Sequence, residues 1–355
     1  MNLFITTLNE IEPINEDSVI KAWKRIDNLT KPIGSLGSLE EIAAKIAGIT
    51  GSINYIISKK NIIIMCADNG VVEEGVSNCP QSFTATVTNN FTKGITGVCV
   101  LSKFSGSDIT VVDVGVNADF KNNKIINRKI AYGTNNMVNG PAMTREQAIQ
   151  AIEVGIEIVA KLKTDGYDLL GTGEMGIGNT TTSAAIISVL SEIDSDIIVG
   201  KGSGLTEKQL DNKRAVVRKA IEVNLPDKND VIDVLSKVGG FDIAALCGCF
   251  LGAAKYKIPI VIDGIISSAA ALCAYKLSSL CRDYMFPSHL SSEPGAKYVM
   301  NEIGLEPILN LKMRLGEGSG CPMTFHIIEG SLYAMNNMAT FEEADLTKDY
   351  FVDIR

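Results

Sequence analysis

The chain has 355 residues, of which 46% are hydrophobic and 32 are glycine, and its formal net charge at pH 7 is −8. This length and composition predict one large domain, a smaller second one and a sizeable core. Nucleic-acid binding needs a concentrated basic surface, and no run of lysine or arginine is long enough to supply one. An anionic ligand must therefore be held by local donors rather than by a global field.

The N-terminal segment 1–10 has no basic region and becomes acidic at Glu10, which is not the pattern of a signal peptide. The longest apolar runs are interrupted by Gly, Lys or Asp before they could cross a bilayer. The sequence therefore predicts a cytoplasmic protein that does not bind a membrane. Helices are expected over 15–29 and 39–50, with a turn over 31–38 between them.

Five short apolar runs predict the strands of a parallel sheet: 61–67, 109–114, 167–170, 196–199 and 258–262. Runs that are apolar on both faces fit strands buried between two layers of helices. Each run ends at a glycine or an acid, which is where parallel α/β sheets bind ligands.

Helical patterns fill the intervals between these strands. Two capping boxes predict helix starts, Thr144 with Gln147 and Thr206 with Gln209. An apolar helix rich in Ala, Gly and Cys is expected over 241–255. The acidic tail 341–345 predicts a solvated helix.

Residues 171–176 match the pattern G-x-G-x-x-G of dinucleotide-binding loops. Two features disfavour a dinucleotide-dependent oxidoreductase. Glu174 would bring a negative charge into the loop meant for pyrophosphate, and the next apolar run ends in Gly200 and Lys201 rather than in an acid for ribose. A better interpretation is a helix that begins near Asn179 and binds phosphate or carboxylate through the free N–H groups of 176–182.

A second glycine-rich segment, 200–204, precedes another predicted helix, in which Lys213 could add a positive charge. Asp68 and Asp263 each end an apolar run, and we expect them to cap the following helix rather than bind a metal or orient a base. The segment 288–295 contains Ser, His and Glu, but local sequence cannot show the convergence that a hydrolase triad needs. His289 is expected to orient a loop or to pack.

Eight cysteines are scattered along the chain without a CxxC pair, which predicts reduced thiols rather than a zinc site. Glu317 lies between two glycines in the segment 314–320, much as Glu174 lies between Gly173 and Gly176. Carboxylates held in glycine-rich segments are candidates for proton transfer. Together with two possible anion sites they suggest an enzyme that acts on a phosphorylated small molecule.

Several segments, in order, resemble those of the nicotinate-nucleotide:dimethylbenzimidazole phosphoribosyltransferase family: 31–37, 67–71, 75–77 with Pro80 and Gln81, 173–181, 239–245 and 314–320. The resemblance extends over nearly the whole chain. The combination of segments 173–181 and 314–320 is specific to this family. It implies a Rossmann-like α/β fold with a mostly parallel sheet in a large domain (45–285), and a small, mainly helical domain from both chain ends (1–44 and 286–355). It also implies a homodimer.

The resemblance implies transfer of phosphoribose from nicotinate mononucleotide to dimethylbenzimidazole or a similar base, without a metal or other cofactor. Glu317 is implied to be the general base, and Glu174 to assist or orient. Residues implied to bind the substrates are Gly176, Ile177, Gly178, Asn179, Thr180, Lys201, Gly202, Ser203, Gly204, Lys213, Ser77, Gln81, Ser291, Leu315 and Gly316.

Three positions depart from the family pattern, which has His at Asn69, an aromatic residue at Cys79 and His at Ala296. The smaller Cys79 could reshape the pocket for the base, so the acceptor is dimethylbenzimidazole, another benzimidazole, adenine or a phenol. The departures also leave open a non-catalytic protein that binds a nucleotide or base.

Overall fold

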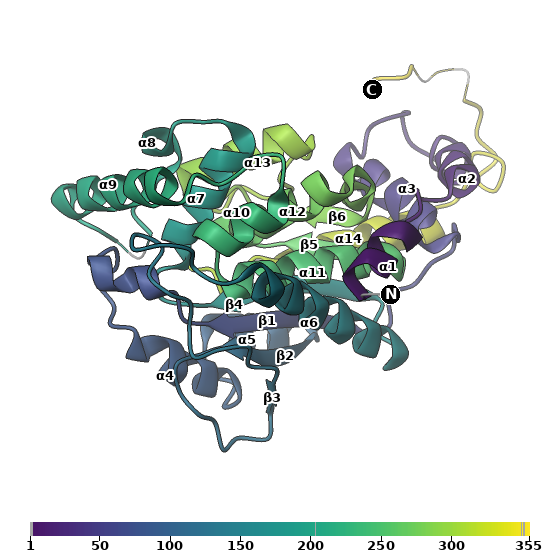
Figure 1. Ribbon diagram of the computed structural model, residues 1–355. Coiled ribbons are helices and arrows are strands. Elements are labelled where there is room, and N and C mark those ends of the chain that lie inside the picture. The colour runs from purple at the N-terminus through teal and green to yellow at the C-terminus, as the bar shows by residue number, and fades with distance from the viewer. Residues whose placement is uncertain (1–2, 203, 349, 351) are drawn as a thin grey trace.

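The computed structural model describes residues 3–202, 204–348, 350 and 352–355 (Figure 1). Its centre is a six-stranded sheet in the order β3-β2-β1-β4-β5-β6, with every neighbouring pair parallel. The strands are β1 (Lys60–Ala67), β2 (Asp108–Gly115), β3 (Ile125–Asn127), β4 (Leu169–Met175), β5 (Ile260–Ile262) and β6 (Met285–Pro287). The predicted α/β class with a parallel sheet is confirmed.

Helices cover both faces of the sheet. One face is covered by α6 (Arg145–Thr164), α11 (Phe241–Lys255) and α12 (Ile265–Leu277), and the other by α4 (Ser82–Phe91), α5 (Gly97–Ser105) and α14 (Cys321–Asn337). Residues 61–67 of β1 are all buried, as expected for a central strand enclosed on both sides.

Two further groups of helices complete the molecule. In a further layer α7 (Asn179–Ser191), α10 (Val231–Val238) and α13 (Pro294–Ile303) pack against α12, and α8 (Ser195–Ile198) and α9 (Glu207–Asn224) pack on α7. The N-terminal segment contains α1 (Leu3–Glu10), α2 (Glu16–Ile26) and α3 (Ser38–Thr50). Two 3-10 helices, η1 (Gly70–Glu74) and η2 (Ser279–Tyr284), lie further along the chain. None of the described helices is both long and apolar enough to cross a membrane.

Most predicted elements are confirmed, including the helices at 16–26, 38–50 and 241–255. Both capping boxes are formed, at Thr144 and at Thr206. The division into a large domain (45–285) and a small one stays a prediction, and its boundary at residue 45 falls within α3.

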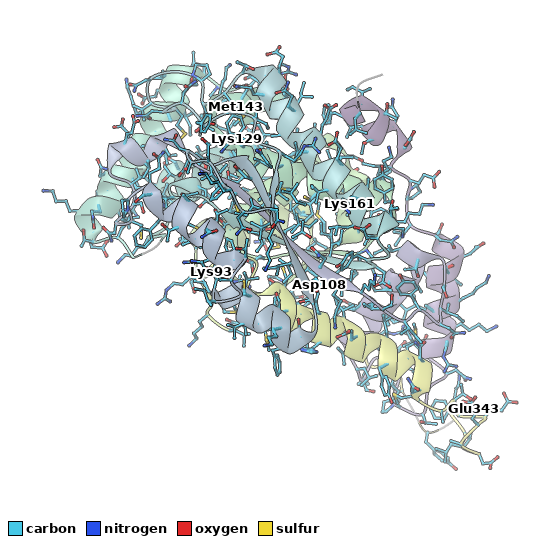
Figure 2. All side chains as sticks on the ribbon, turned by 90° about the horizontal axis from the view of Figure 1, so that it is seen from below. Lys93, Asp108, Lys129, Met143, Lys161 and Glu343 are labelled. Carbon is cyan, nitrogen blue, oxygen red and sulfur yellow. The ribbon has the colours of Figure 1, made fainter. Side chains whose placement is uncertain are left out.

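Two predicted elements are wrong. The expected strand 196–199 is the short helix α8, whose start is capped by Asp194 through a 2.9 Å hydrogen bond from the N–H of Asp196. Four apolar residues carry too little periodicity to separate strand from helix. The acidic tail 341–345 forms turns that end at Asp345 with φ +54°, so no helix propagates there. Figure 2 shows Glu343 of this tail at the far tip of the molecule.

Candidate active site

A cavity of about 310 Å³ lies at the carboxyl ends of β4 and β5. Its lining includes these predicted residues: Ser77, Glu174, Gly176, Ile177, Gly178, Asn179, Thr180, Gly202, Ser291, Leu315, Gly316 and Glu317. Segments more than two hundred residues apart in the sequence therefore meet around one space. The position fits the rule that open α/β sheets bind ligands at the carboxyl ends of their strands.

Glu174 lies near the end of β4 and is only 7% exposed. Its Oε2 accepts a hydrogen bond from Nδ2 of Asn179, and its Oε1 accepts one from the backbone N–H of Glu317 at 3.2 Å. Burial raises the pKa of Glu174 to about 8 despite the Asn179 hydrogen bond, and the carboxylates of Asp242 and Asp263 add to the rise. The side chain is therefore a neutral acid at pH 7.

Asn179, the first residue of α7, links Glu174 to a second buried acid. Its Nδ2 also donates to Oδ2 of Asp242 at 3.0 Å, and burial raises the pKa of Asp242 to about 6. Asn69 is fully buried, hydrogen-bonds to Asp242 and accepts from Oγ1 of Thr182 at 3.3 Å. The departure at position 69 therefore lies behind Asn179 and not in the cavity wall.

Glu317 lies in the loop between α13 and α14, and the backbone of this loop is left-handed over three residues. Its φ is +63°, between Gly316 at +80° and Gly318 at +94°. Glycine adopts such angles at little cost, whereas Glu317 is strained and must be held by its contacts. Its Oε2 accepts the backbone N–H of Val98 at 3.1 Å, at the start of α5. Burial raises the pKa of Glu317, and the N–H groups of Val98 and Gly97 oppose the rise.

The first two glycines of the G-x-G-x-x-G pattern lie inside β4, where Gly171 pairs with Ile62 and Gly173 with Ile64. A Cβ at Gly173 would lie 2.2 Å from the carbonyl oxygen of Glu317. The glycine therefore lets the loop of Glu317 approach the strand, and it does not form a pyrophosphate loop. This explains the misleading motif match.

Asp263 follows β5 and is 4% exposed. Its two oxygens accept from the backbone N–H groups of Gly318 at 3.1 Å and Gly320 at 2.7 Å. Burial raises the pKa of Asp263 to about 7. The prediction that Asp263 caps the following helix is wrong, because its oxygens bind backbone N–H groups of the loop after Glu317 instead. Those N–H groups lie 55 and 57 positions away, so the local sequence could not indicate them. Asp68 likewise accepts from the N–H of Asn117 at 2.7 Å rather than capping a helix.

His289 lines the cavity next to Asp263 but does not form a hydrolase triad. Its Nδ1 lies 3.0 Å from Oγ of Ser288 and 3.9 Å from Oδ1 of Asp263, and Ser288 is fully buried. A triad requires the hydroxyl and the acid at opposite nitrogens of the ring. The expectation that His289 packs and orients a loop fits this geometry.

The buried ammonium of Lys213 lies behind Thr180, which lines the cavity. Its Nζ donates to Oγ1 of Thr180 at 2.7 Å, and burial lowers the pKa of Lys213 to about 8. The N–H of Gly202 is taken by Oε1 of Glu293 at 2.9 Å, and that of Ile177 by Oγ1 of Thr84 at 3.1 Å. The N–H groups of Asn179 and Thr181 bind the carbonyls of Gly176 and Gly178. The expectation that these N–H groups are free is therefore wrong at all four positions.

Part of the cavity wall is apolar. It consists of Val76, Cys79, Phe83, Val87, Met175 and Leu315. Phe83 and Val87 lie one turn apart on α4, which gives them a common face. Of the three departures, Cys79 alone belongs to this wall, since Ala296 is buried on α13. All eight cysteines are free, and seven of them are buried.

Four predicted residues do not line the cavity. Oε1 of Gln81 accepts from Asn117 at 3.3 Å, and Lys201 forms an exposed ion pair with Glu207. The carbonyl of Gly204 binds Nδ2 of Asn78, and Lys213 acts from behind Thr180. Ser203 lies outside the described residues. Lining residues not predicted include Phe83, Val87, Ile265, Ile266, His289, Glu293 and Arg314, whose spacing in sequence carries no shared signal.

Comparisons with known proteins are consistent over the whole chain. The profile of a family described as phosphoribosyltransferase matches residues 11–346. The nicotinate-nucleotide–dimethylbenzimidazole phosphoribosyltransferase of Clostridium tetani is 59% identical over 356 residues, covering 100% of this chain and 98% of that protein. The enzyme of that name from Ruminiclostridium cellulolyticum is 58% identical, covering 97% of each.

A solved structure agrees with these relatives. The crystal structure of the phosphoribosyltransferase of the same name from Thermus thermophilus is 34% identical in sequence and superposes with a TM-score of 0.89. The match covers 94% of this chain and 100% of that one.

Proposed function

The chain belongs to the nicotinate-nucleotide–dimethylbenzimidazole phosphoribosyltransferase family, and from this premise we propose the roles that its cavity residues play. The enzyme moves phosphoribose from nicotinate mononucleotide to dimethylbenzimidazole or a related base, which yields an α-riboside 5′-phosphate and nicotinate. The observation that carries the assignment of roles is the convergence of Glu174 and Glu317, which a 3.2 Å hydrogen bond joins in one cavity.

The reaction requires the protein to orient the two substrates and to supply one proton acceptor. The bond between ribosyl C1′ and the pyridinium nitrogen breaks, and its electron pair returns to the ring, which leaves neutral at that nitrogen. The unprotonated ring nitrogen of the acceptor forms the new bond to C1′, and the N–H of its other ring nitrogen becomes acidic. Glu317 takes that proton as general base. Positive charge on C1′ in the transition state is stabilised by the same carboxylate.

Glu174 has a different role, because burial among other acids keeps it protonated. A neutral carboxylic acid that lines the cavity can donate a hydrogen bond to a substrate oxygen or nitrogen. It also holds the backbone N–H of Glu317 and so fixes the loop that carries the base. Glu174 therefore orients, while Glu317 accepts the proton.

The phosphate of the nucleotide is assigned to the part of the cavity at Thr180 and Lys213. A buried ammonium with a lowered pKa gains a favourable partner when a dianion binds. Glu293 now holds the N–H of Gly202, so phosphate binding there requires that carboxylate to move aside. The acceptor base is assigned to the apolar part of the wall, at Cys79, Phe83 and Val87, which suits a flat aromatic ring.

A homodimer is proposed on the basis of an apolar face formed by α5 and α14. Figure 2 shows these two helices side by side, with α14 in yellow. On their outer surface Val100 is 58%, Phe104 70% and Tyr333 71% exposed. Large apolar side chains gathered in this way mark a contact surface. Sedimentation should give twice the chain mass for the wild type and a monomer for Phe104→Glu.

The activity itself is tested by incubating the protein with nicotinate mononucleotide and a panel of acceptors. The panel contains dimethylbenzimidazole, unsubstituted benzimidazole, adenine and a phenol, and mass spectrometry detects the riboside phosphate. We expect product with at least one benzimidazole. Binding of the nucleotide without product from any acceptor would reject the transferase and leave a binding protein.

A further inference from the structure

The carboxylate of Glu293 binds a distant segment of the chain and does not cap its own helix. Glu293 is the N-cap residue of α13, yet among the described residues its side chain forms no cap hydrogen bond. Its Oε1 instead accepts the backbone N–H of Gly202 at 2.9 Å, 91 positions earlier in the sequence. The side chain is buried and lines the cavity. Glu293 therefore supplies a negative charge to the glycine-rich segment that precedes α9.

The contact with Gly200 places the same carboxylate independently of that hydrogen bond. A Cβ at Gly200 would lie 2.1 Å from Oε2 of Glu293 and 2.7 Å from Cδ of Pro294, so no side chain fits there. The φ of Gly200 lies outside the left-handed region, so the backbone angle does not call for glycine. The glycine leaves room for the carboxylate at the start of α13. The two oxygens of Glu293 thus lie against two glycines of one segment.

The ammonium of Lys213 lies next to the donor that Glu293 uses. Lys213 is fully buried, and its Nζ donates to Oγ1 of Thr180 at 2.7 Å. A Cβ at Gly202 would lie 3.0 Å from that Oγ1 and 3.3 Å from Nζ of Lys213. A buried ammonium is unfavourable without a negative charge nearby. The charge of Glu293 supports the charged form of Lys213 and opposes the lowering of its pKa by burial.

A phosphate group would use the same donors. Phosphate and carboxylate oxygens both accept hydrogen bonds from backbone N–H groups, and both are stabilised by a nearby cation. The 5′-phosphate is assigned above to Thr180 and Lys213, next to the N–H of Gly202. Two anions at this place repel each other. Binding of the phosphate and retention of the carboxylate therefore exclude each other.

We propose that Glu293 is an internal competitor of the 5′-phosphate, which holds the phosphate site when no nucleotide is bound and leaves it when one binds. This inference rests on the phosphate site of the proposed function. A site that is partly held by another group binds its ligand with an affinity reduced by that fraction. The carboxylate therefore weakens the binding of nicotinate mononucleotide and of the riboside phosphate alike. Its return to Gly202 favours release of the product.

The test compares Glu293→Gln with Glu207→Gln. Glutamine keeps the shape of Glu293 and removes its charge. Glu207 forms an exposed ion pair with Lys201 of the same segment, so its Gln variant changes the net charge equally and leaves Glu293 in place. Calorimetric titration gives the Kd of inorganic phosphate and of nicotinate mononucleotide, each without an acceptor base. We expect Glu293→Gln to lower both Kd values about tenfold, as for one hydrogen bond to a charged group, and Glu207→Gln to change them less than about twofold.

A second variant separates competition from stability. Glu293→Gln also removes the countercharge of Lys213, so its melting temperature should be lower without ligand and should rise more than that of the wild type when phosphate is added. Glu293→Asp keeps the charge but is one methylene shorter, so its carboxylate withdraws from Gly202. We expect this variant to keep the wild-type melting temperature and to bind phosphate about threefold more tightly.

Two results would overturn the inference. One is a Kd for phosphate that both Glu293 variants leave unchanged. The other is weaker binding of both ligands to Glu293→Gln, since the carboxylate would then hold the substrate and not compete with it. Lys213→Met tests the phosphate site itself. If phosphate binds this variant as tightly as the wild type, the site assigned under the proposed function fails first, and the inference fails with it.

Discussion

The two glycine-flanked glutamates differ in almost everything except their local sequence. Glu174 is part of β4, is nearly fully buried and is neutral at pH 7, because it lies among other acids. Glu317 lies in a left-handed loop, is half-buried and gives its carboxylate to the start of α5. Burial keeps Glu174 protonated. The carboxylate of Glu317, the proposed base, instead accepts a hydrogen bond from the first turn of α5.

Two titratable groups with divergent environments are the usual way in which a site separates acid and base roles. Here the separation has identifiable causes. Asp242 and Asn179 stand behind Glu174, whereas Asp263 and α5 hold the loop of Glu317. The comparison teaches that a motif containing glycine and glutamate does not specify a protonation state, since burial and partners do.

The proposed difference between the roles of Glu174 and Glu317 would be contradicted most clearly if Glu317 were dispensable for turnover. Glu317→Gln keeps the shape and removes the proton acceptor, so turnover should fall by more than about a hundredfold. The measurement is kcat with nicotinate mononucleotide and dimethylbenzimidazole at pH 8. A rate within a few fold of the wild type would remove Glu317 from its assigned role.

Asp263→Asn should give the next largest effect. The amide cannot accept from both Gly318 and Gly320, so the loop of Glu317 loosens while β4 is unaffected. We expect kcat to fall by about tenfold, as for loss of one hydrogen bond to a charged group, with KM for nicotinate mononucleotide nearly unchanged. The matched control is Asp242→Asn, which disturbs the partner of Asn179 and should leave the loop in place.

Glu174→Gln should have a small effect at neutral pH, because glutamine resembles a protonated glutamate. The pH profile should differ more than the rate. With a pKa of about 8, wild-type Glu174 ionises as pH rises through that value, and activity should decline on the alkaline side. The Gln variant should show a weaker decline from pH 7 to 9. A loss as large as that of Glu317→Gln would contradict the asymmetry of the two residues.

The smallest effect concerns stability. In the unfolded chain Glu174 loses its proton at the ordinary glutamate pKa of 4.5, whereas in the folded protein it keeps it until about pH 8. The stabilisation from this residue is therefore full below about pH 4.5 and is lost as pH rises to 8. Relative to the wild type, the melting temperature of Glu174→Gln should increase by a few degrees from pH 5 to pH 8. A constant difference would argue against a buried neutral acid.

Local patterns were sufficient for the central strands and the capped helices. The apolar runs at 61–67 and 109–114 and the boxes at Thr144 and Thr206 all formed as predicted, since they depend on near neighbours. The resemblance to the family in turn identified most of the residues that line the cavity. Errors arose where local sequence is ambiguous, as at 196–199 and in the acidic tail.

The sequence by itself determined the chemical groups available and the sheet ends at which they would meet. Only the tertiary structure decided what each group does. The hydrogen bond from Glu317 to Glu174 spans 143 positions and that from Val98 to Glu317 spans 219. Burial and hydrogen bonding between such distant segments set whether a carboxyl keeps its proton, and neither quantity exists until the chain has folded.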